Sequence, residues 1–456
     1  MFNIYTITDD VDVFVAFETM NNRGKPLSHL ELLKNRLIFL STKFDVEQSE
    51  KTKLRCAINE AWKSAYHFIG MNENCALDDD EFLKVHFFLY FGSQLPKRSS
   101  NQDIDRLLWS YEHEDYYKDY LLEDVFTSQR LPTVINQFTS LLPFLSIKSL
   151  YDYAQSVKTS VEKYYRLFNP ADASISGEEK IYLERLRRLG IDTDMAVLLL
   201  ALFQVKSDVS TRVNILVLLE KIHFLYSISP YIEGLDRIEY MKLGVDLSAG
   251  NQSVKQIIDK LITHSNQMVK KIHFSTVLAI STKYKSYYGW KGIKYFMFEY
   301  EQSLLEKSRT KRNKLIWDEF IKEDFETDYR TVEHIYPQKV ISDCWKRLFN
   351  NYEVSQRNTL KNSIGNLIPL SISKNSSLQN KCFTEKKGNS SNKAGYAYGC
   401  YSEIEVSQLE DWTPNEILSR GLRLLEFMEQ RWGLSLGTES QKIKALGLEF
   451  VKKDGA

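Results

Sequence analysis

Helical periodicity between about residues 50 and 275 constrains the fold of this chain more than any other feature. Apolar residues recur there every three or four positions, as in EKTKLRCAINEAWKSAYHFI and STRVNILVLLEKIHFLYSI, which is the spacing of one face of an α-helix. The chain contains only nine prolines in 456 residues, so few of these patterns are interrupted. We therefore predict a mainly α-helical fold, with a small α+β module where the pattern changes.

The domain organisation follows from chain length and from the places where the pattern changes. A chain of 456 residues is expected to form about three domains. Capping boxes begin helices at Ser28 with Glu31 and at Thr413 with Glu416, whereas short extended runs and a Lys/Ser/Asn-rich stretch lie between about 330 and 400. We predict an N-terminal piece at 1–45, a helical linker domain at 46–274, the α+β domain at 275–435 and a tail at 436–456.

Composition excludes several classes of protein. Sixty basic residues balance sixty acidic ones, so the net charge is zero and gives no indication of a nucleic-acid partner. The longest apolar run, MAVLLLALF, is far shorter than the ~20 residues of a membrane-spanning helix, and we expect no membrane partner. The N-terminal sequence lacks the basic region of a signal peptide, and the five cysteines form no CxxC pair. We therefore expect a cytoplasmic protein with reduced thiols and no structural zinc site.

Two other local patterns have structural explanations. The acidic run in CALDDDEF lacks the glycine and the later glutamate of a calcium-binding loop, and acids at a helix N-terminus explain it better. His67, His86 and His223 lie beside aromatic residues at helical spacing. We expect these three histidines in the core or at an interface.

The neutral total hides a basic segment. Residues 331–400 contain ten basic and four acidic residues, a net excess of six positive charges. Phosphate binding would need such a bias, although a solvated basic loop would show it as well. The basic residues are Lys339, Lys346, Arg347, Arg357, Lys361, Lys374, Lys381, Lys386, Lys387 and Lys393.

The last of the eight histidines, His334, lies in this segment within VEHIYPQ. Neighbouring residues on an extended strand point to opposite sides, so Glu333 can face a metal ion while His334 faces a water molecule. Phosphodiester hydrolysis needs such a base and a hard cation with carboxylate and amide ligands, and Asn366 and Asn375 follow at short spacing. Taken alone, this set also fits a turn histidine with asparagines in surface loops.

The segments VEHIYPQ and IGNLIPLSISKN resemble the core of HNH (His-Me finger, ββα-metal) nucleases. The longer pattern, EHIYPQ…GNLIPLSISKNSSLQNKCFTEKK with a W…I..R helix after it, resembles the C-terminal domain of GmrSD-type modification-dependent restriction endonucleases. The resemblance implies that His334 is the general base, that Glu333 and Asn375 bind Mg²⁺ or Mn²⁺, and that Asn366 holds the histidine loop. Phosphate contacts with DNA are expected from four lysines: Lys374, Lys381, Lys386 and Lys387.

The N-terminal stretch FETMNNRGKPLSHLELLKN resembles the end of the sulfiredoxin/ParB-like domain of the same family. In the family that domain binds and hydrolyses NTP through an earlier DGQQR-type motif, which this sequence does not contain. We therefore expect residues 1–45 to be a remnant of that domain. A truncated or split chain, a misassigned start, or a partner polypeptide with the NTPase half would explain this.

The resemblance implies a metal-dependent DNA endonuclease that restricts foreign DNA in antiviral defence, with modified cytosine as a candidate target. Two alternatives stay open. The chain could be a non-catalytic or partner-dependent interaction subunit, with the helical middle region binding the partner. It could also be an RNA-cleaving toxin, because hydrolysis of RNA and DNA shares the same phosphodiester chemistry.

Overall fold

The computed structural model describes residues 27–71, 77–95, 116–132, 143–171, 174–175, 177–230, 232, 238–283, 287–321, 332–370, 378–388 and 395–453. Within these ranges the chain is mainly α-helical, as predicted. It divides into two compact units, unit 1 with residues 1–216 and 238–259 and unit 2 with residues 217–237 and 260–456. None of the described helices combines the length and apolar character that a membrane crossing needs.

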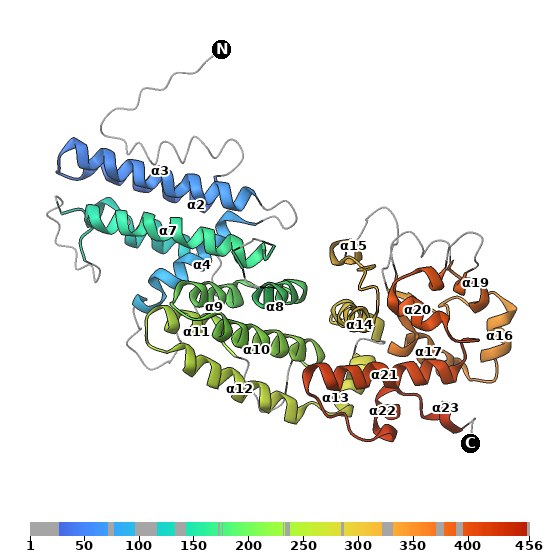
Figure 1. The fold of residues 1–456 in the computed structure, drawn as a ribbon. Helices are drawn as coiled ribbons and strands as arrows, with labels where there is room; N and C mark the ends of the chain where they lie inside the picture. Colours follow the sequence, from blue (N-terminus) through green and yellow to red (C-terminus); the bar gives the residue numbers. More distant parts are fainter. Residues whose placement is uncertain are drawn as a thin grey trace, which may run out of the picture. The chain divides into compact units, whose positions relative to one another are not determined.

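Unit 1 is built from paired helices. Its elements are α2 (His29–Lys43), α3 (Gln48–Gly70), α4 (Asp79–Phe91), η1 (Gly92–Gln94), α6 (Tyr116–Asp119), η2 (Tyr120–Val125), η3 (Ser128–Arg130), α7 (Ile147–Phe168), α8 (Gly177–Leu189), α9 (Thr193–Gln204) and α11 (Tyr240–Ser248). The chain passes between the units in α10 (Val209–Ile228) and α12 (Val254–Lys271). α3 lies along α7, and α9 packs against α11 (Figure 1). The α9–α11 approach needs Gly244, because a Cβ there would lie 2.8 Å from the backbone of Leu198.

Helices in both units begin where the sequence predicts capping boxes. At α2 the Glu31 amide donates to Ser28 Oγ, and the Ser28 amide donates to the Glu31 carboxylate. The Thr413–Glu416 pair forms the same arrangement at the helix that begins with Pro414. Each box satisfies two of the amides that the first turn of a helix leaves without intrahelical partners.

The acidic run at the start of α4 also caps a helix. Asp78 Oδ1 accepts hydrogen bonds from the amides of Asp80 (2.8 Å) and Glu81 (3.0 Å). Among the described residues, Asp78, Asp79 and Asp80 form the one acidic group compact enough to share a cation. Their hydrogen bonds fit the predicted capping role at the positive end of the helix dipole.

His86 lies in the core of unit 1. It is 2% exposed, its Nε2 lies 2.9 Å from Ser156 Oγ, and its ring packs edge-on against Tyr153. Its predicted burial is therefore confirmed. His223 is half-buried, whereas His67 is exposed. His67 lies on the outer face of α3, so the prediction that it lies in the core is wrong.

The burial of His86 predicts a pH-dependent stability. Desolvation lowers the pKa of His86 to about 3, whereas an unfolded histidine titrates near ~6.5. Between about pH 6.5 and pH 3, His86 therefore binds a proton in the unfolded state but stays neutral in the folded state. The His86 contribution is complete above about pH 6.5, and the free energy of unfolding then falls by ~1.4 kcal/mol per pH unit as the pH drops toward 3. We expect His86→Gln to show a smaller slope between about pH 6.5 and 5 in urea unfolding; equal slopes would contradict this.

Unit 2 combines helices with a small sheet. Its elements are η4 (Tyr287–Gly289), β1 (Val332–His334), η5 (Ile364–Asn366), β2 (Leu367–Pro369), η6 (Tyr396–Tyr398) and the helices α13 (Phe274–Lys283), α14 (Ile293–Lys307), α15 (Trp317–Ile321), α16 (Asp343–Phe349), α17 (Val354–Asn362), α19 (Phe383–Lys387), α20 (Tyr401–Ser407), α21 (Pro414–Trp432), α22 (Glu439–Leu446) and α23 (Glu449–Lys453).

The core of unit 2 joins α10, α14 and α21. Phe224 stacks on Trp432, with ring centroids 3.5 Å apart. The buried carboxylate of Glu220 accepts hydrogen bonds from Tyr295 Oη (2.6 Å) and Trp432 Nε1 (3.0 Å), and it pairs with Arg431 at 3.1 Å. A buried charge with this many partners fixes the three helices in one arrangement.

The segment predicted as a C-terminal tail takes part in this packing. α22 contacts α13 and α21, and Ala445 O accepts a hydrogen bond from the buried Tyr287 hydroxyl at 2.7 Å. Residues 217–237 and 260–274, predicted within the helical linker domain, also belong to unit 2. The contact division thus differs from the predicted domain boundaries.

β1 and β2 form an antiparallel pair, with Val332 opposite Pro369 and His334 opposite Leu367. These are the two short extended runs that the sequence predicts. Asn375, the other metal ligand that the resemblance implies, falls within residues 371–377, which lie outside the described residues. The complete ββα-metal module therefore stays a prediction.

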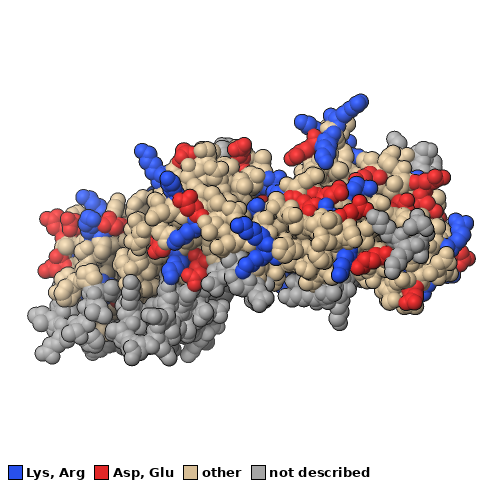
Figure 2. Space-filling model, turned by 90° about the horizontal axis from the view of Figure 1, so that it is seen from below, with Lys and Arg blue, Asp and Glu red and all other residues tan. Residues whose placement is uncertain are grey.

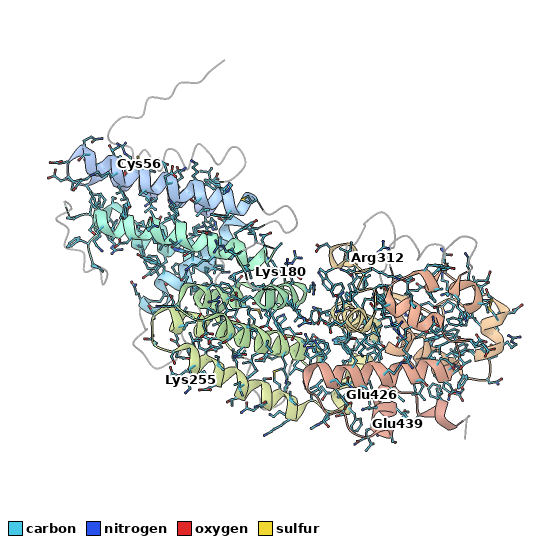
Figure 3. The ribbon with its side chains drawn as sticks, viewed as in Figure 1. Cys56, Lys180, Lys255, Arg312, Glu426 and Glu439 are labelled. Atoms are coloured by element: carbon cyan, nitrogen blue, oxygen red, sulfur yellow. A yellow bond between two sulfur atoms is a disulfide. The ribbon has the colours of Figure 1, made fainter. Side chains whose placement is uncertain are left out.

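The cysteines depart from the expectation of reduced thiols. Cys344, at the start of α16, forms a disulfide with Cys382, just before α19. Cys400 is buried and Cys56 is exposed on α3 (Figure 3), and Cys75 lies outside the described residues. No sequence pattern indicated this bond. The two cysteines are 38 positions apart, and only folding of the segment between them brings their α-carbons to 6.0 Å.

Candidate active site

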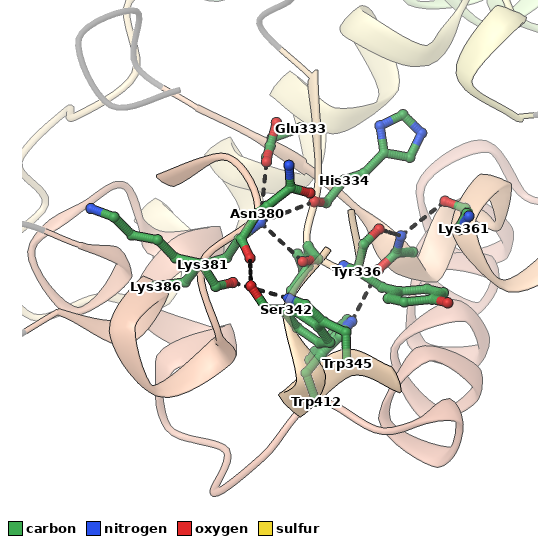
Figure 4. A network of polar contacts seen from close by, with 12 residues as sticks. Glu333, His334, Tyr336, Ser342, Trp345, Lys361, Asn380, Lys381, Lys386 and Trp412 are labelled. Carbon is green, nitrogen blue, oxygen red and sulfur yellow. Dashed lines mark hydrogen bonds and ion pairs between the residues drawn. The ribbon is translucent and has the colours of Figure 1, made fainter. Parts of the chain in front are cut away.

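The side chains of Glu333 and His334 leave β1 on different sides (Figure 4). The strand is held by its pairing with β2, and the Ile335 amide extends this pairing by donating to Asn366 O at 3.0 Å. Val332 and Ile335 are buried beside them. The alternation predicted for an extended segment thus separates the carboxylate from the imidazole.

Asn366 fixes the turn that follows His334. Its side chain has no exposed surface, and both of its polar atoms are used. Oδ1 accepts from the Tyr336 amide (2.8 Å) and from Trp412 Nε1 (3.0 Å). Nδ2 donates to Tyr336 O and to Lys361 O, each at 2.9 Å. This is the geometry expected of a residue that holds the histidine loop.

The start of α21 holds the Asn366 turn from the other side. Besides the bond from Trp412, the fully buried Arg420 donates from Nη1 to Gly365 O (2.8 Å) and Leu367 O (2.6 Å), the carbonyls on either side of Asn366. The backbone of η5 touches α21, since a Cβ at Gly365 would lie 2.0 Å from Ile417 O. The sequence pattern W…I..R is therefore the support of this turn.

A buried lysine neutralises Glu333. Lys386 has no exposed surface, and its Nζ lies 3.2 Å from Glu333 Oε1 and also donates to His334 O (3.3 Å) and Ile335 O (3.0 Å). Burial raises the pKa of Glu333 and lowers that of Lys386, and in each case their attraction opposes the shift. The position of Lys386 does not fit the predicted DNA contact, because no phosphate can reach a fully buried ammonium.

We expect Lys386→Met to destabilise unit 2 by about 3 kcal/mol, because it leaves the largely buried Glu333 carboxylate without its cation. The double variant Lys386→Met with Glu333→Gln removes both charges and should recover at least half of the loss. Urea unfolding measures both effects, with Lys381→Met at an exposed lysine as the control. Equal stability of the wild type and the single variant would disprove a structural role for the pair.

His334 is 8% exposed, and its neighbours include Tyr288 and Gln338. Its ring packs against Tyr288, with centroids 4.9 Å apart. Its Nε2 lies 2.7 Å from Gln338 Nε2, and this amide nitrogen also donates to Asn362 Oδ1 at 2.9 Å. Gln338 is part of the VEHIYPQ motif, but its spacing alone assigned it no role. Tyr288 and His334 are 46 positions apart, so no local sequence pattern could have predicted the contact between their rings.

The remaining predicted residues lie apart from this core. Lys381 is exposed, which fits a contact with phosphate. Lys387 is half-buried, and its Nζ donates to the backbone carbonyl of Leu409 at 2.7 Å, so its ammonium already has a partner within the protein. Lys374 and Asn375 lie outside the described residues. On the face shown in Figure 2, both acidic and basic side chains are scattered over the described surface, in keeping with the balanced composition.

One predicted metal ligand, Glu333, lies within the described residues. A carboxylate has about four lone-pair sites, so the bond from Lys386 leaves room for a cation. Mg²⁺ commonly takes one or two protein carboxylates and fills its other positions with water and substrate phosphates. The residues present thus fit a site in which Glu333 is one ligand and phosphate oxygens supply others.

Comparison with known proteins gives a family match for this region. Residues 275–427 match the family model described as GmrSD restriction endonucleases, C-terminal domain. The predicted family is confirmed over this stretch. The GmrSD C-terminal region contains β1, β2, Asn366 and the part of α21 that supports the Asn366 turn. The match supports a restriction endonuclease. No curated protein and no solved structure matches the chain.

Proposed function

We propose that the chain is a metal-dependent DNA endonuclease of a restriction system. The observation that carries this proposal is the turn after His334, which the hydrogen bonds of Asn366 hold in place, within the region that matches the GmrSD model. There the buried Asn366 side chain fixes the loop after β1, with Glu333 on one side of the strand and His334 on the other. A rigid scaffold that separates a carboxylate from an imidazole suits hydrolysis by a base and a bound cation.

In this proposal His334 is the general base. Its neutral imidazole takes a proton from water, the water oxygen forms a bond to phosphorus, and the bond from phosphorus to the leaving oxygen breaks. Glu333 and Asn375 would hold Mg²⁺ or Mn²⁺, and the cation would supply neutralisation of the charge that develops on the phosphate. Asn366 acts as a positioning residue, because its hydrogen bonds hold the backbone next to His334.

The proposed substrate is foreign DNA, with modified cytosine as the first candidate. The basic excess of residues 331–400 supports a polyanionic substrate. Lys381, on the exposed surface, and Lys374 are the proposed phosphate contacts. We place the protein in the cytoplasm and in antiviral defence, with NTP dependence supplied by a partner polypeptide if the system uses it.

A partner-dependent subunit is the second candidate. One contact favours it, because in the isolated chain His334 Nε2 is paired with Gln338. A partner or a substrate would be needed to separate the two side chains.

The test is cleavage of plain DNA, hydroxymethylcytosine DNA, glucosylated DNA and RNA by the purified chain. Each substrate is incubated with Mg²⁺, with Mn²⁺ and with EDTA. We expect cleavage of DNA with either metal ion and none with EDTA. Preference for a modified DNA would identify the target, and cleavage of RNA alone would replace the proposal with an RNA-cleaving toxin. No cleavage of any substrate, with NTP present, would favour the partner-dependent subunit.

A further inference from the structure

The hydrogen-bond chain that ends at His334 has a defined direction. It starts at the backbone carbonyl of Asn358, which can only accept. Asn362 Nδ2 donates to this carbonyl at 2.9 Å, so Asn362 Oδ1 is the atom that faces Gln338. Oδ1 can only accept, so Gln338 presents its NH₂ group. The same NH₂ group lies 2.7 Å from His334 Nε2, which must therefore accept as well.

This direction determines where the proton of the imidazole resides. A neutral imidazole has one N–H and one nitrogen with a lone pair. Because Nε2 accepts from Gln338, Nε2 carries the lone pair and Nδ1 carries the proton. The only lone pair of His334 is therefore occupied by Gln338.

We propose that Gln338 masks the base nitrogen of His334 in the resting chain, so that His334 can accept a proton from water only after Gln338 moves. This inference rests on the proposed function for its effect on catalysis, but the masking itself is a property of the free chain. Gln338 lies on the surface, whereas His334 is buried. The amide can therefore exchange its hydrogen bonds with water without disturbing the core.

The position of the mask is held by α17. Lys361 Nζ donates to the backbone carbonyl of Gln338 at 2.9 Å, and Asn362 holds the side chain. Both contacts come from the last turn of the same helix, whose Lys361 carbonyl is in turn bound by Asn366. The scaffold that holds the histidine loop therefore also holds the residue that covers its base.

The test is the tautomer of His334, read from the ¹⁵N signals of the protein labelled with ¹⁵N-histidine at about pH 8, where an ordinary histidine is neutral. The signals that disappear in His334→Gln identify this residue among the eight histidines. We expect the wild type to carry its proton on Nδ1. In Gln338→Ala the group that donates to Nε2 is gone, and the proton should move to Nε2, the tautomer that histidine side chains generally prefer.

Gln338→Glu tests whether the tautomer depends on the hydrogen-bond donor of residue 338 or only on a side chain of that size next to His334. It keeps the length of the side chain but presents only acceptors, so it should also place the proton on Nε2. Lys339→Ala, at the exposed neighbouring position, should leave the wild-type tautomer unchanged. A wild-type proton on Nε2, or an unchanged tautomer in Gln338→Ala, would overturn the proposal.

A kinetic measurement adds the functional consequence. We expect Gln338→Ala to raise the single-turnover rate of DNA cleavage by about threefold to tenfold, since one surface hydrogen bond opposes the active form. A lower rate would mean that Gln338 positions His334 productively, and would overturn the masking role. If the wild type cleaves nothing, the proposed function has failed, and the NMR measurement still decides whether the mask exists.

Discussion

Replacing His334 with alanine should lower the rate of DNA cleavage by ~10²–10⁴-fold, the usual contribution of a positioned general base. His334 is the histidine on β1, its ring lies against Tyr288, and its loop is fixed by Asn366. In the proposed mechanism the imidazole is the acceptor for the proton of the attacking water, and alanine removes it. Single-turnover cleavage with excess enzyme and Mg²⁺ measures the chemical step.

His273→Ala is the matched control for this variant. His273 is exposed and lies in the same unit, so its removal should leave the rate unchanged. Circular dichroism and thermal unfolding of both variants distinguish loss of chemistry from loss of the fold. Equal rates for the wild type and His334→Ala, with both proteins folded, would show that His334 is not the base.

Asn366→Ala should cost about 4 kcal/mol in the free energy of unfolding of unit 2. The change removes the Asn366 hydrogen bonds of three buried groups, the Tyr336 amide, the Tyr336 carbonyl and Trp412 Nε1, and of the part-buried Lys361 carbonyl. Each buried group that loses its hydrogen bond costs ~1–3 kcal/mol, and relaxation of the turn recovers part of the sum. Urea unfolding followed by tryptophan fluorescence reports this loss.

Asn366→Asp tests the same site without a cavity. The carboxylate keeps the two bonds that Oδ1 accepts, but its second oxygen then faces the carbonyls of Tyr336 and Lys361, so we expect a comparable loss. Asn350→Ala, at an exposed position at the end of α16, is the control. A loss below about 1 kcal/mol in Asn366→Ala would contradict its structural role.

Local sequence chemistry predicted much of this fold. The capping boxes at Ser28 and Thr413 begin helices, and the three- to four-residue spacing of apolar positions in α7 corresponds to its buried face. The short extended runs became β1 and β2. These features depend on interactions within a few residues, which a single sequence displays directly.

The partners of the site residues could not be predicted in the same way. Lys386 is one of ten basic residues in its segment, and the sequence pattern suggested a surface role for it. The structure places it in the core, against a carboxylate 53 positions earlier. The Cys344–Cys382 bond joins distant segments in the same way.

The sequence by itself determined the helical class, the helix starts and the set of Glu333, His334 and Asn366. Only the tertiary structure decided that Lys386 pairs with Glu333, that Gln338 contacts His334 Nε2 and that α21 supports the Asn366 turn. The reason is physical. Capping and periodicity arise from neighbours along the chain, whereas burial and hydrogen-bond direction arise when distant segments pack and exclude water.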